Sequence, residues 1–384
     1  MPRRIAQCIH GLGLGGAQKV VETLVTSLRN PDLEHFVYCS IDGPVRSRLE
    51  ASGVRVRVIP RALPKFDPIW VGHLANAMES DQIDLVHTHL FGDSLHGYLA
   101  AQKAGELPVT MTLHSTHSFF SRLQRKGYRW LLPRCSEVVA CSPSVGSSFV
   151  EAIPQLRDKM RVIPNGIHLE LQATHSPDEL HEFRRTLGLE AGTLVLLAMG
   201  RFVESKGYRD LIQAYSDLPA PVKARSQLLF LGQGPLERDL QKLSSSLNLS
   251  GRVIFGGYRQ DVRRILSVCD VVVFSSLSEG LPIALLEAMA AERCIVATNI
   301  EGFRDVVAHE SEALLARPAD PQDLCAAIER ALSDSSLRAR LGDRARVRFS
   351  RHFTAEAMVE SYARLYSDLL AGEQNPIRSR QHLH

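Results

Sequence analysis

The chain has 384 residues, of which 45% are hydrophobic, and its formal net charge is +3 at pH 7. This length suffices for two or three domains with substantial cores, and the near-neutral charge argues against nucleic acid as the main partner. No apolar run approaches the length of about 18 residues that a membrane-spanning helix needs, and the stretch after Arg3 and Arg4 is too short for a secretory signal. We therefore expect a cytoplasmic protein that is at most peripherally bound to a membrane.

The seven cysteines are dispersed, and none belongs to a Cys-x-x-Cys sequence or to a zinc motif with histidine. They lie mostly in apolar, strand-like runs, at positions 8, 39, 135, 141, 269, 294 and 325. An odd number of scattered cysteines in a long chain is typical of reduced, buried thiols. We expect no metal site.

Short β-rich runs alternate with helical segments along the chain, which is the pattern of parallel α/β sheets. The first half has such runs at 4–10, 36–41, 54–59, 84–89, 109–114, 137–142 and 160–164. The second half has them at 193–200, 227–232, 252–257, 270–275, 294–299 and 312–317. The polar stretch 168–190 reads as a connection with one short helix. This pattern predicts two doubly wound domains, residues 1–175 and 176–350.

A glycine loop follows the first predicted strand. Gly11, Gly13 and Gly16 match the G-x-G-x-x-G sequence of dinucleotide-binding folds, and Asp42 closes the next strand, where those folds place a ribose-binding acid. An NAD-dependent oxidoreductase is therefore an alternative interpretation of this half.

Histidines are concentrated in the first half, at positions 10, 87, 89, 96, 114 and 117. His87 and His89 alternate along one predicted strand and so share a face. His114 stands where a parallel strand ends, the position from which open α/β sheets reach their ligands. We expect His114 and His10 to face a ligand and the other histidines to be structural partners.

A basic stripe follows His114. Arg122, Arg125, Lys126 and Arg129 recur at helical spacing, and the apolar residues Phe120, Leu123, Trp130 and Leu131 fall largely on the other side. Such a helix can rest on an anionic membrane surface. The alternative is an amphipathic helix that packs on the core and has a solvated charged face.

A second glycine loop follows the strand at 193–200. Arg201 and Lys206 stand between Gly200 and Gly207, so two cations lie at the carboxyl end of a strand where the backbone can approach a ligand closely. An arginine can bind a diphosphate bidentately, while a lysine supplies a point charge.

Two glutamates follow the strand at 270–275 with seven residues between them. A helix that starts near Pro282 places Glu287 on its second turn and leaves Glu279 in the preceding loop. Both carboxylates can then accept hydrogen bonds from sugar hydroxyls, while the amides of Gly280 and Leu281 face phosphate. Sugar and phosphate are expected together at this place.

The tail predicts a helix over residues 351–372 with one apolar stripe. The stripe comprises Met358, Tyr362, Leu365, Tyr366 and Leu369. We expect residues 373–384 to be disordered.

The Gly-Arg…Lys-Gly loop and the Glu-x7-Glu element together resemble the retaining group 1 glycosyltransferases of family 4, which have the GT-B fold of two facing Rossmann-like domains. The resemblance implies that Arg201 and Lys206 bind the donor pyrophosphate, Glu287 the ribose and Glu279 the transferred sugar. It also implies that Gly15 and Gly16 belong to a ligand loop, that His114 contacts the sugar, and that the last helix crosses back to the first domain.

The resemblance further implies transfer of a hexose, with retention at the anomeric carbon, from a nucleotide sugar, by default a UDP-sugar, to a glycan or lipid-linked hydroxyl acceptor. The chain has no Asp-x-Asp sequence, so we expect Arg201 and Lys206 to replace a metal ion and no cofactor to be needed. A catalytically inactive sugar-nucleotide-binding scaffold is a further alternative.

Overall fold

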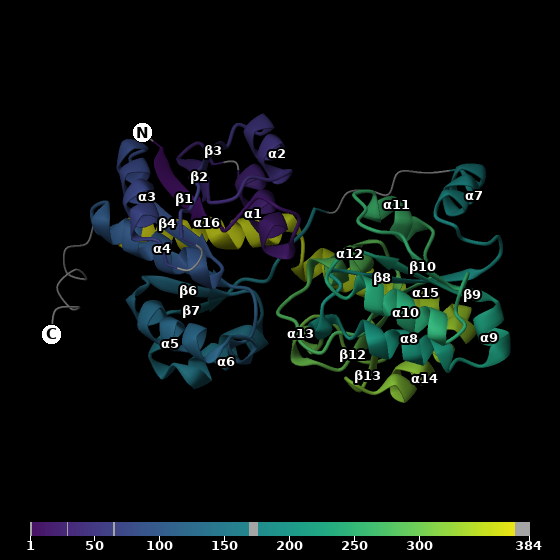
Figure 1. The fold of residues 1–384 in the computed structure, drawn as a ribbon. Coiled ribbons are helices and arrows are strands. Elements are labelled where there is room, and N and C mark those ends of the chain that lie inside the picture. The colour runs from purple at the N-terminus through teal and green to yellow at the C-terminus, as the bar shows by residue number, and fades with distance from the viewer. Residues whose placement is uncertain (1, 29, 64–65, 169–175, 373–384) are drawn as a thin grey trace. The chain divides into compact units, whose positions relative to one another are not determined.

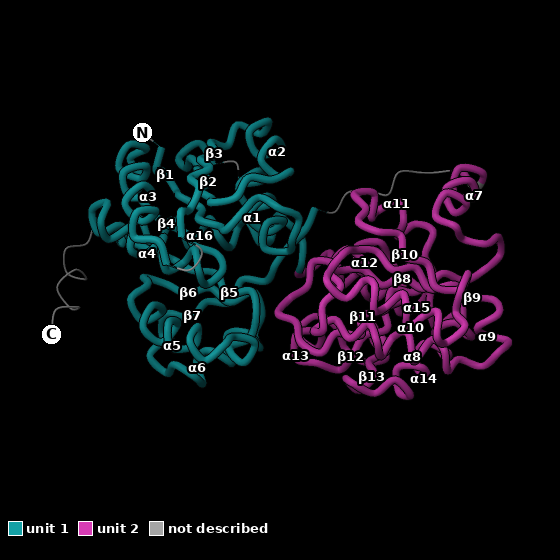
Figure 2. Tube along the Cα trace, viewed as in Figure 1, with its two compact units in different colours: residues 1–168, 353–384 teal, residues 169–352 magenta. Residues whose placement is uncertain are grey.

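The computed structural model describes residues 2–28, 30–63, 66–168 and 176–372. The chain divides into two compact units (Figure 2): residues 1–168 with 353–384, and residues 169–352. Each unit is an α/β structure built on one parallel sheet. The thirteen predicted strands are all present, because each apolar run lies between glycine- or polar-rich breaks.

The first unit has a sheet of seven parallel strands in the order β3, β2, β1, β4, β5, β6, β7. In register, Ile5 of β1 lies opposite His35 of β2 and Leu85 of β4. The strands are β1 (Arg3–Cys8), β2 (Leu33–Cys39), β3 (Arg55–Val58), β4 (Leu85–His89), β5 (Val109–Leu113), β6 (Glu137–Ala140) and β7 (Met160–Val162).

Helices cover both faces of this sheet (Figure 1). Local sequence sets their starts: Asp67 accepts from the amides of Ile69 and Trp70 before one helix, and Ser121 forms a capping box with Gln124 before another. The α-helices are α1 (Gly16–Ser27), α2 (Val45–Ala51), α3 (Pro68–Ser80), α4 (Phe91–Lys103), α5 (Arg122–Leu131) and α6 (Pro143–Ala152). Short 3₁₀ turns are η1 (His117–Phe119), η2 (Leu132–Arg134) and η3 (Pro154–Leu156).

The second unit has six parallel strands in the order β10, β9, β8, β11, β12, β13. They are β8 (Leu194–Met199), β9 (Ser226–Leu231), β10 (Val253–Phe255), β11 (Val271–Phe274), β12 (Cys294–Thr298) and β13 (Leu314–Ala316). The core cluster on one face packs Phe202, Tyr208 and Phe230 against leucine and valine side chains.

The helices of the second unit include the short helix expected in the connection, α7 (Pro177–Thr186). The others are α8 (Tyr208–Ser216), α9 (Ala220–Ala224), α10 (Glu237–Ser246), α11 (Val262–Ser267), α12 (Ile283–Ala290), α13 (Glu301–Arg304), α14 (Pro321–Ser333) and α15 (Ser335–His352), with the 3₁₀ turn η4 (Glu204–Lys206).

The last helix, α16 (Ala355–Gly372), belongs to the first unit, as predicted. In Figure 1 it is the yellow helix among purple and blue elements. Met358, Tyr362, Leu365 and Tyr366 are buried, and Leu370 is buried where the predicted stripe placed Leu369. The Asp368 carboxylate also pairs with Arg161 of β7, 3.0 Å away. The predicted disorder of 373–384 lies outside the described residues.

The basic segment forms α5, but the predicted apolar side was partly wrong. Tyr128 and Leu131, three residues apart, take the buried face, whereas Leu123 is 76% and Trp130 42% exposed. The helix also approaches α4 closely, since a Cβ on Gly127 would lie 2.3 Å from the Phe91 ring. Two large apolar side chains therefore lie on the same solvent side as the basic residues.

The seven cysteines are thiols rather than disulfides, and all except the half-buried Cys325 are buried, as expected. Within the described part of the chain, no helix combines the length and apolar character needed to cross a membrane.

Candidate functional site

Strand order changes direction between β8 and β11 in the second unit, where both strands are central. Ligands of open α/β sheets bind at the carboxyl ends of the strands beside such a switch point. The loop of residues 200–207 follows β8, and the loop of residues 275–282 follows β11. Sheet topology thus brings the two predicted motifs to one place.

Glycine geometry joins these two loops. Gly207 has φ +61°, and a Cβ there would lie 2.1 Å from the carbonyl oxygen of Ser275. The Ser275 hydroxyl donates to the carbonyl of Lys206 at 2.8 Å, and the Leu277 amide donates to Ser205 at 2.8 Å. Only glycine fits this close approach of two backbones.

Lys206 and Glu279 meet directly. The lysine Nζ lies 2.5 Å from Glu279 Oε1, which also accepts from the Ser276 hydroxyl at 2.6 Å. Both side chains are mostly shielded, with 20% and 13% of their surface exposed. An ammonium group and a carboxylate are therefore held together at the carboxyl edge of the sheet.

The other residues predicted for this site lie close to Lys206 and Glu279 in the sequence. The Arg201 side chain is exposed and bonds no described residue. Helix α12 begins at Ile283 with Pro282 as its N-cap, so Glu287 stands on the second turn as predicted and is half-buried. Gly280 and Leu281 are buried in the loop before it.

Tyr208 was missed at the sequence level. It is 4% exposed, and its hydroxyl is enclosed without a hydrogen-bond partner. A Cβ on Gly200 would lie 3.0 Å from this hydroxyl and 3.3 Å from Lys206 Cε, so the group points toward the glycine loop. Burial, and then the Glu279 charge, raise the pKa of Tyr208, and the phenol is neutral. No sequence pattern distinguishes it from a core aromatic.

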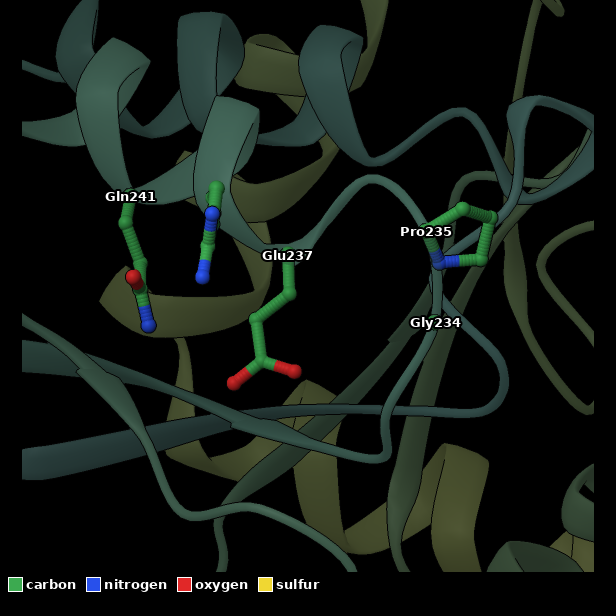
Figure 3. A pocket seen from close by; sticks show the side chains of 5 residues that line it. Gly234, Pro235, Glu237 and Gln241 are labelled. Atoms are coloured by element: carbon green, nitrogen blue, oxygen red, sulfur yellow. The ribbon is translucent and has the colours of Figure 1, made fainter.

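A pocket of about 340 Å³ lies at the start of α10 (Figure 3). It extends from the loop after β9 onto the first turns of the helix, from which the side chains of Glu237 and Gln241 extend to the same side (Figure 3). A Cβ on Gly234 would lie 2.7 Å from the Phe202 amide nitrogen, so the pocket loop packs on the residue after Arg201. The pocket is lined by Gly234, Pro235, Glu237, Arg238 and Gln241.

The first unit has its own switch point, between β1 and β4. Gly15 caps α1 and Gly16 begins it, both exposed, as the glycine loop predicted. Leu90, directly after β4, has φ +67° and ψ +144°, a conformation that costs a non-glycine residue about 1–3 kcal/mol. Such strain is concentrated at functional sites.

His10 follows β1 at this edge, and its side chain is 51% exposed. Its Nδ1 lies 3.6 Å from the Asp93 carboxylate and 3.4 Å from the Ser40 hydroxyl. Arg61 pairs with the same Asp93, which is buried. Partial burial, and then the Arg61 charge, lower the pKa of His10.

His114 follows β5 as predicted and is half-buried. Its Nε2 lies 3.2 Å from Nδ1 of His89. The rings of His87 and His89 are in contact, with centroids 4.1 Å apart and planes tilted by 40°, so the two residues share a face as expected. Burial lowers the pKa of His114 to about 4 and holds those of His87 and His89 well below 6.5. All three are neutral at pH 7.

Asp42, the acid expected to bind ribose in a dinucleotide site, already has other hydrogen-bond and ion-pair partners. Asp42 bonds its neighbouring Gly43 amide at 2.7 Å and pairs with Arg46 at 3.0 Å. Gly11 pairs with Ile41 through an isolated β-bridge. Among the residues that the structure describes, no group of three or more histidine, cysteine or carboxylate side chains is arranged to hold a metal ion.

Two family models match the two halves of the chain. Residues 181–348 match the model described as glycosyl transferases group 1, and residues 14–171 match glycosyltransferase family 4. Together these ranges cover most of both units.

Individual proteins agree with the models. N-acetyl-alpha-D-glucosaminyl L-malate synthase of Bacillus anthracis is 25% identical, covering 81% of this chain and 82% of its own. UDP-Gal:alpha-D-GlcNAc-diphosphoundecaprenol alpha-1,3-galactosyltransferase of Escherichia coli is 27% identical, covering 94% and 95%. The crystal structure of Anabaena HepE in complex with UDP and glucose has a TM-score of 0.86 at 23% identity, covering 95% and 100%.

The oxidoreductase interpretation is thereby replaced, since the models include Gly15 and Gly16 at the end of the glycine loop as well as the Arg201 and Glu279 loops. This chain belongs to the group 1 glycosyltransferases of family 4 and has a fold of the GT-B type.

Proposed function

We propose that this glycosyltransferase transfers a hexose from a UDP-sugar to a hydroxyl acceptor, and that Arg201 and Lys206 bind the donor diphosphate. The observation that carries the proposal is the contact of Lys206 with Glu279 at the switch point of the second sheet. The E. coli relative is named for a UDP-galactose donor, and the Anabaena structure contains UDP and glucose.

The Lys206–Glu279 contact gives a mechanism for donor capture. Without a donor, Glu279 neutralises Lys206, and Ser276 holds the carboxylate. An entering diphosphate competes for the ammonium group, because phosphate oxygens are strong acceptors of charge-assisted hydrogen bonds. Glu279, released from the lysine, then accepts hydrogen bonds from sugar hydroxyls, and Glu287 binds the ribose.

Protein cations take the place of a metal in this proposal. The departing diphosphate carries the developing negative charge, and its stabilisation is the main electrostatic task. Arg201, Lys206 and the backbone amides at the start of α12 can together stabilise this negative charge. Transfer should therefore continue in EDTA. Loss of activity in EDTA that Mg²⁺ restores would disprove this part.

For the chemical step we propose retention by a front-face route. The acceptor oxygen bonds to the anomeric carbon on the face from which the diphosphate leaves, the bond to the diphosphate breaks, and a phosphate oxygen takes the acceptor proton. Glu279 and Glu287 are not the carboxylate pair of a glycoside hydrolase. A product of inverted anomeric configuration, seen by NMR, would exclude this route.

We propose a glycan or lipid-linked precursor as the acceptor, reached at the cytoplasmic face of the membrane through α5. The exposed Leu123 and Trp130 share the helix with Arg122, Lys126 and Arg129, which are also exposed. Apolar and cationic side chains on one surface suit an anionic bilayer. Co-sedimentation with anionic but not neutral vesicles is expected, and equal or absent binding to both would refute the membrane contact.

The donor assignment is tested by thermal shift with a panel of nucleotide sugars. A ligand that binds the native state raises its melting temperature by mass action. The expected shift with one or more UDP-sugars should disappear in Lys206→Gln and persist in Lys242→Gln, a matched change at an exposed lysine of α10. Slow release of sugar to water from the bound donor would separate an active enzyme from an inactive binding scaffold.

A further inference from the structure

The Tyr208 side chain has a hydroxyl that its packing does not require. Tyr208 is the first residue of α8, and its ring makes edge-to-face contacts with Phe202 and Phe230, at centroid distances of 5.6 and 5.2 Å. The residue is 4% exposed, and no described residue bonds its hydroxyl. A phenylalanine would make the same ring contacts, whereas a buried hydroxyl without a partner costs stability. Packing therefore does not explain the hydroxyl.

The hydroxyl lies beside the Lys206 side chain. A Cβ on Gly200 would lie 3.0 Å from the Tyr208 hydroxyl, 3.3 Å from Lys206 Cε and 3.6 Å from Lys206 Nζ. Gly200 has φ +146°, a conformation that favours glycine, so no side chain stands between the two groups. The phenol and the end of the lysine side chain therefore face each other across this glycine.

The ammonium group of Lys206 can serve more than one partner. The lysine backbone is fixed, because its carbonyl accepts from the Ser275 hydroxyl at 2.8 Å. Its Nζ carries three hydrogens, and among the described residues it bonds only Glu279 Oε1, at 2.5 Å. Rotation of the flexible four-carbon stem moves the ammonium group and leaves the backbone in place. The other ammonium hydrogens can thus bond a phosphate oxygen and a neutral acceptor nearby.

We propose that Tyr208 is a positioning residue for the donor diphosphate, whose hydroxyl accepts a hydrogen bond from the Lys206 ammonium group when the diphosphate displaces Glu279. The inference rests on the proposed function, in which Lys206 leaves Glu279 for the diphosphate. It adds the group that holds the lysine in its second position.

A neutral hydroxyl suits this role better than a charged group. It fixes the ammonium group without neutralising the positive charge that the phosphates need. A carboxylate at the same place would compete with the diphosphate for the lysine, as Glu279 does without a donor. Burial, and then the Glu279 charge, raise the pKa of Tyr208, so the phenol keeps its hydrogen, which remains for an anion of the site.

The test compares protein stability with affinity for UDP in Tyr208→Phe. Without UDP the hydroxyl has no partner to lose, so the urea midpoint of unfolding should equal or exceed that of the wild type. Isothermal titration calorimetry should show that UDP binds about 10- to 100-fold more weakly, which corresponds to the loss of one hydrogen bond to a charged group. A lower urea midpoint, or an unchanged affinity for UDP, would overturn the proposal.

Tyr215→Phe provides a matched control on the same helix. Tyr215 is also buried, but its hydroxyl already donates to the Ser226 carbonyl at 2.8 Å. Its loss should lower the urea midpoint and leave the affinity for UDP unchanged, the opposite of the result expected for Tyr208→Phe. Equal losses of UDP affinity in the two variants would indicate a general disturbance of α8 and contradict the role of Tyr208.

Variants of Lys206 separate this inference from the proposed function. At millimolar UDP, adding Tyr208→Phe to Lys206→Gln should weaken binding no further, because the ammonium group is already absent. A full additional loss would show that the hydroxyl acts independently of Lys206, and the proposal would be wrong. If Lys206→Gln itself leaves the affinity for UDP unchanged, the proposed diphosphate site is wrong. If only Tyr208→Phe leaves it unchanged, the diphosphate site stands and this inference falls.

Discussion

Both units are built on a parallel sheet, but they differ in the number of polar side chains buried on its strands. On the strands of the first unit the buried polar residues are Gln7, His35, His87, Thr88, His89, Thr110 and Thr112, whereas on those of the second they are Ser226, Gln227 and Thr298. The second unit places its charges in loops at the sheet edge, while the first keeps a neutral hydrogen-bonded layer within its core.

The difference gives α16 a role beyond covering an apolar face. Tyr366 contacts Gln7 and His87, and Tyr362 contacts Thr112. A buried polar group without a partner costs about 1–3 kcal/mol, so the polar strands of the first unit need the hydroxyls of this helix. The second unit has fewer buried polar residues on its strands, and there a helix hydroxyl, that of Tyr215, donates to the Ser226 carbonyl.

The largest expected effect lies in the second unit and concerns activity. Lys206→Gln should lower the rate of sugar transfer about 100- to 1,000-fold, as loss of one preorganised electrostatic group typically does. Steady-state assays with the preferred donor measure this. Lys242→Gln should retain the wild-type rate, and a similar loss in both variants would show that Lys206 has no special role.

The next largest expected effect is a difference between the units in how their stability depends on pH. Burial lowers the pKa of His35 and His114 to about 4, and those of His87 and His89 lie well below 6.5. Below pH 6.5 the unfolded chain therefore binds more protons than the folded unit. The contribution of these histidines to the free energy of unfolding should be complete above pH 6.5. On acidification below that pH it should decrease by about 1.4 kcal/mol per pH unit for each histidine.

The two tryptophans make this measurable, because Trp70 and Trp130 both lie in the first unit. Tryptophan fluorescence reports that unit alone, whereas circular dichroism reports both. Acid titration should change the fluorescence at a higher pH than part of the dichroism signal. Coincident transitions would remove the distinction between the two cores.

Removal of one hydroxyl from each unit should show a smaller difference. Tyr366→Phe deprives both Gln7 and His87 of a partner, and a cost of about 1–3 kcal/mol is expected. Tyr215→Phe in the second unit removes a hydroxyl that donates to the Ser226 carbonyl at 2.8 Å, and should cost about 1 kcal/mol. Urea unfolding curves compare them, and a larger loss for Tyr215→Phe would contradict the comparison.

The smallest effect on stability is expected at the surface of α5. Leu123→Gln should change the free energy of unfolding by less than about 0.5 kcal/mol, because the side chain is 76% exposed, yet weaken binding to anionic vesicles. Val347→Gln alters an apolar residue of α15 that is 42% exposed, and serves as control. Unchanged vesicle binding in Leu123→Gln would leave the basic residues as the only membrane contacts.

Much of the fold was predictable from local pattern. The thirteen strands, the start of α12 after Pro282 and the buried stripe of α16 follow from periodicity and from glycine and proline signals that act over a few residues. The common face of His87 and His89 follows from the alternation of a strand. The solvent side of α5 was not predictable, because helical spacing alone does not say which of two mixed faces the core accepts.

The sequence by itself therefore determined the two α/β units, the apolar stripe of the last helix and the loops that carry Arg201, Lys206, Glu279 and Glu287, while the return of that helix to the first unit was implied by the family resemblance. Only the tertiary structure decided that Lys206 meets Glu279, 73 residues away, that the Tyr208 hydroxyl is buried beside them, and that Gln7, His89 and Tyr366 join into one hydrogen-bonded chain. The physical reason is that hydrogen bonds and ion pairs depend on ångström distances, which strand order and packing set, whereas apolar periodicity specifies only which face of an element is buried.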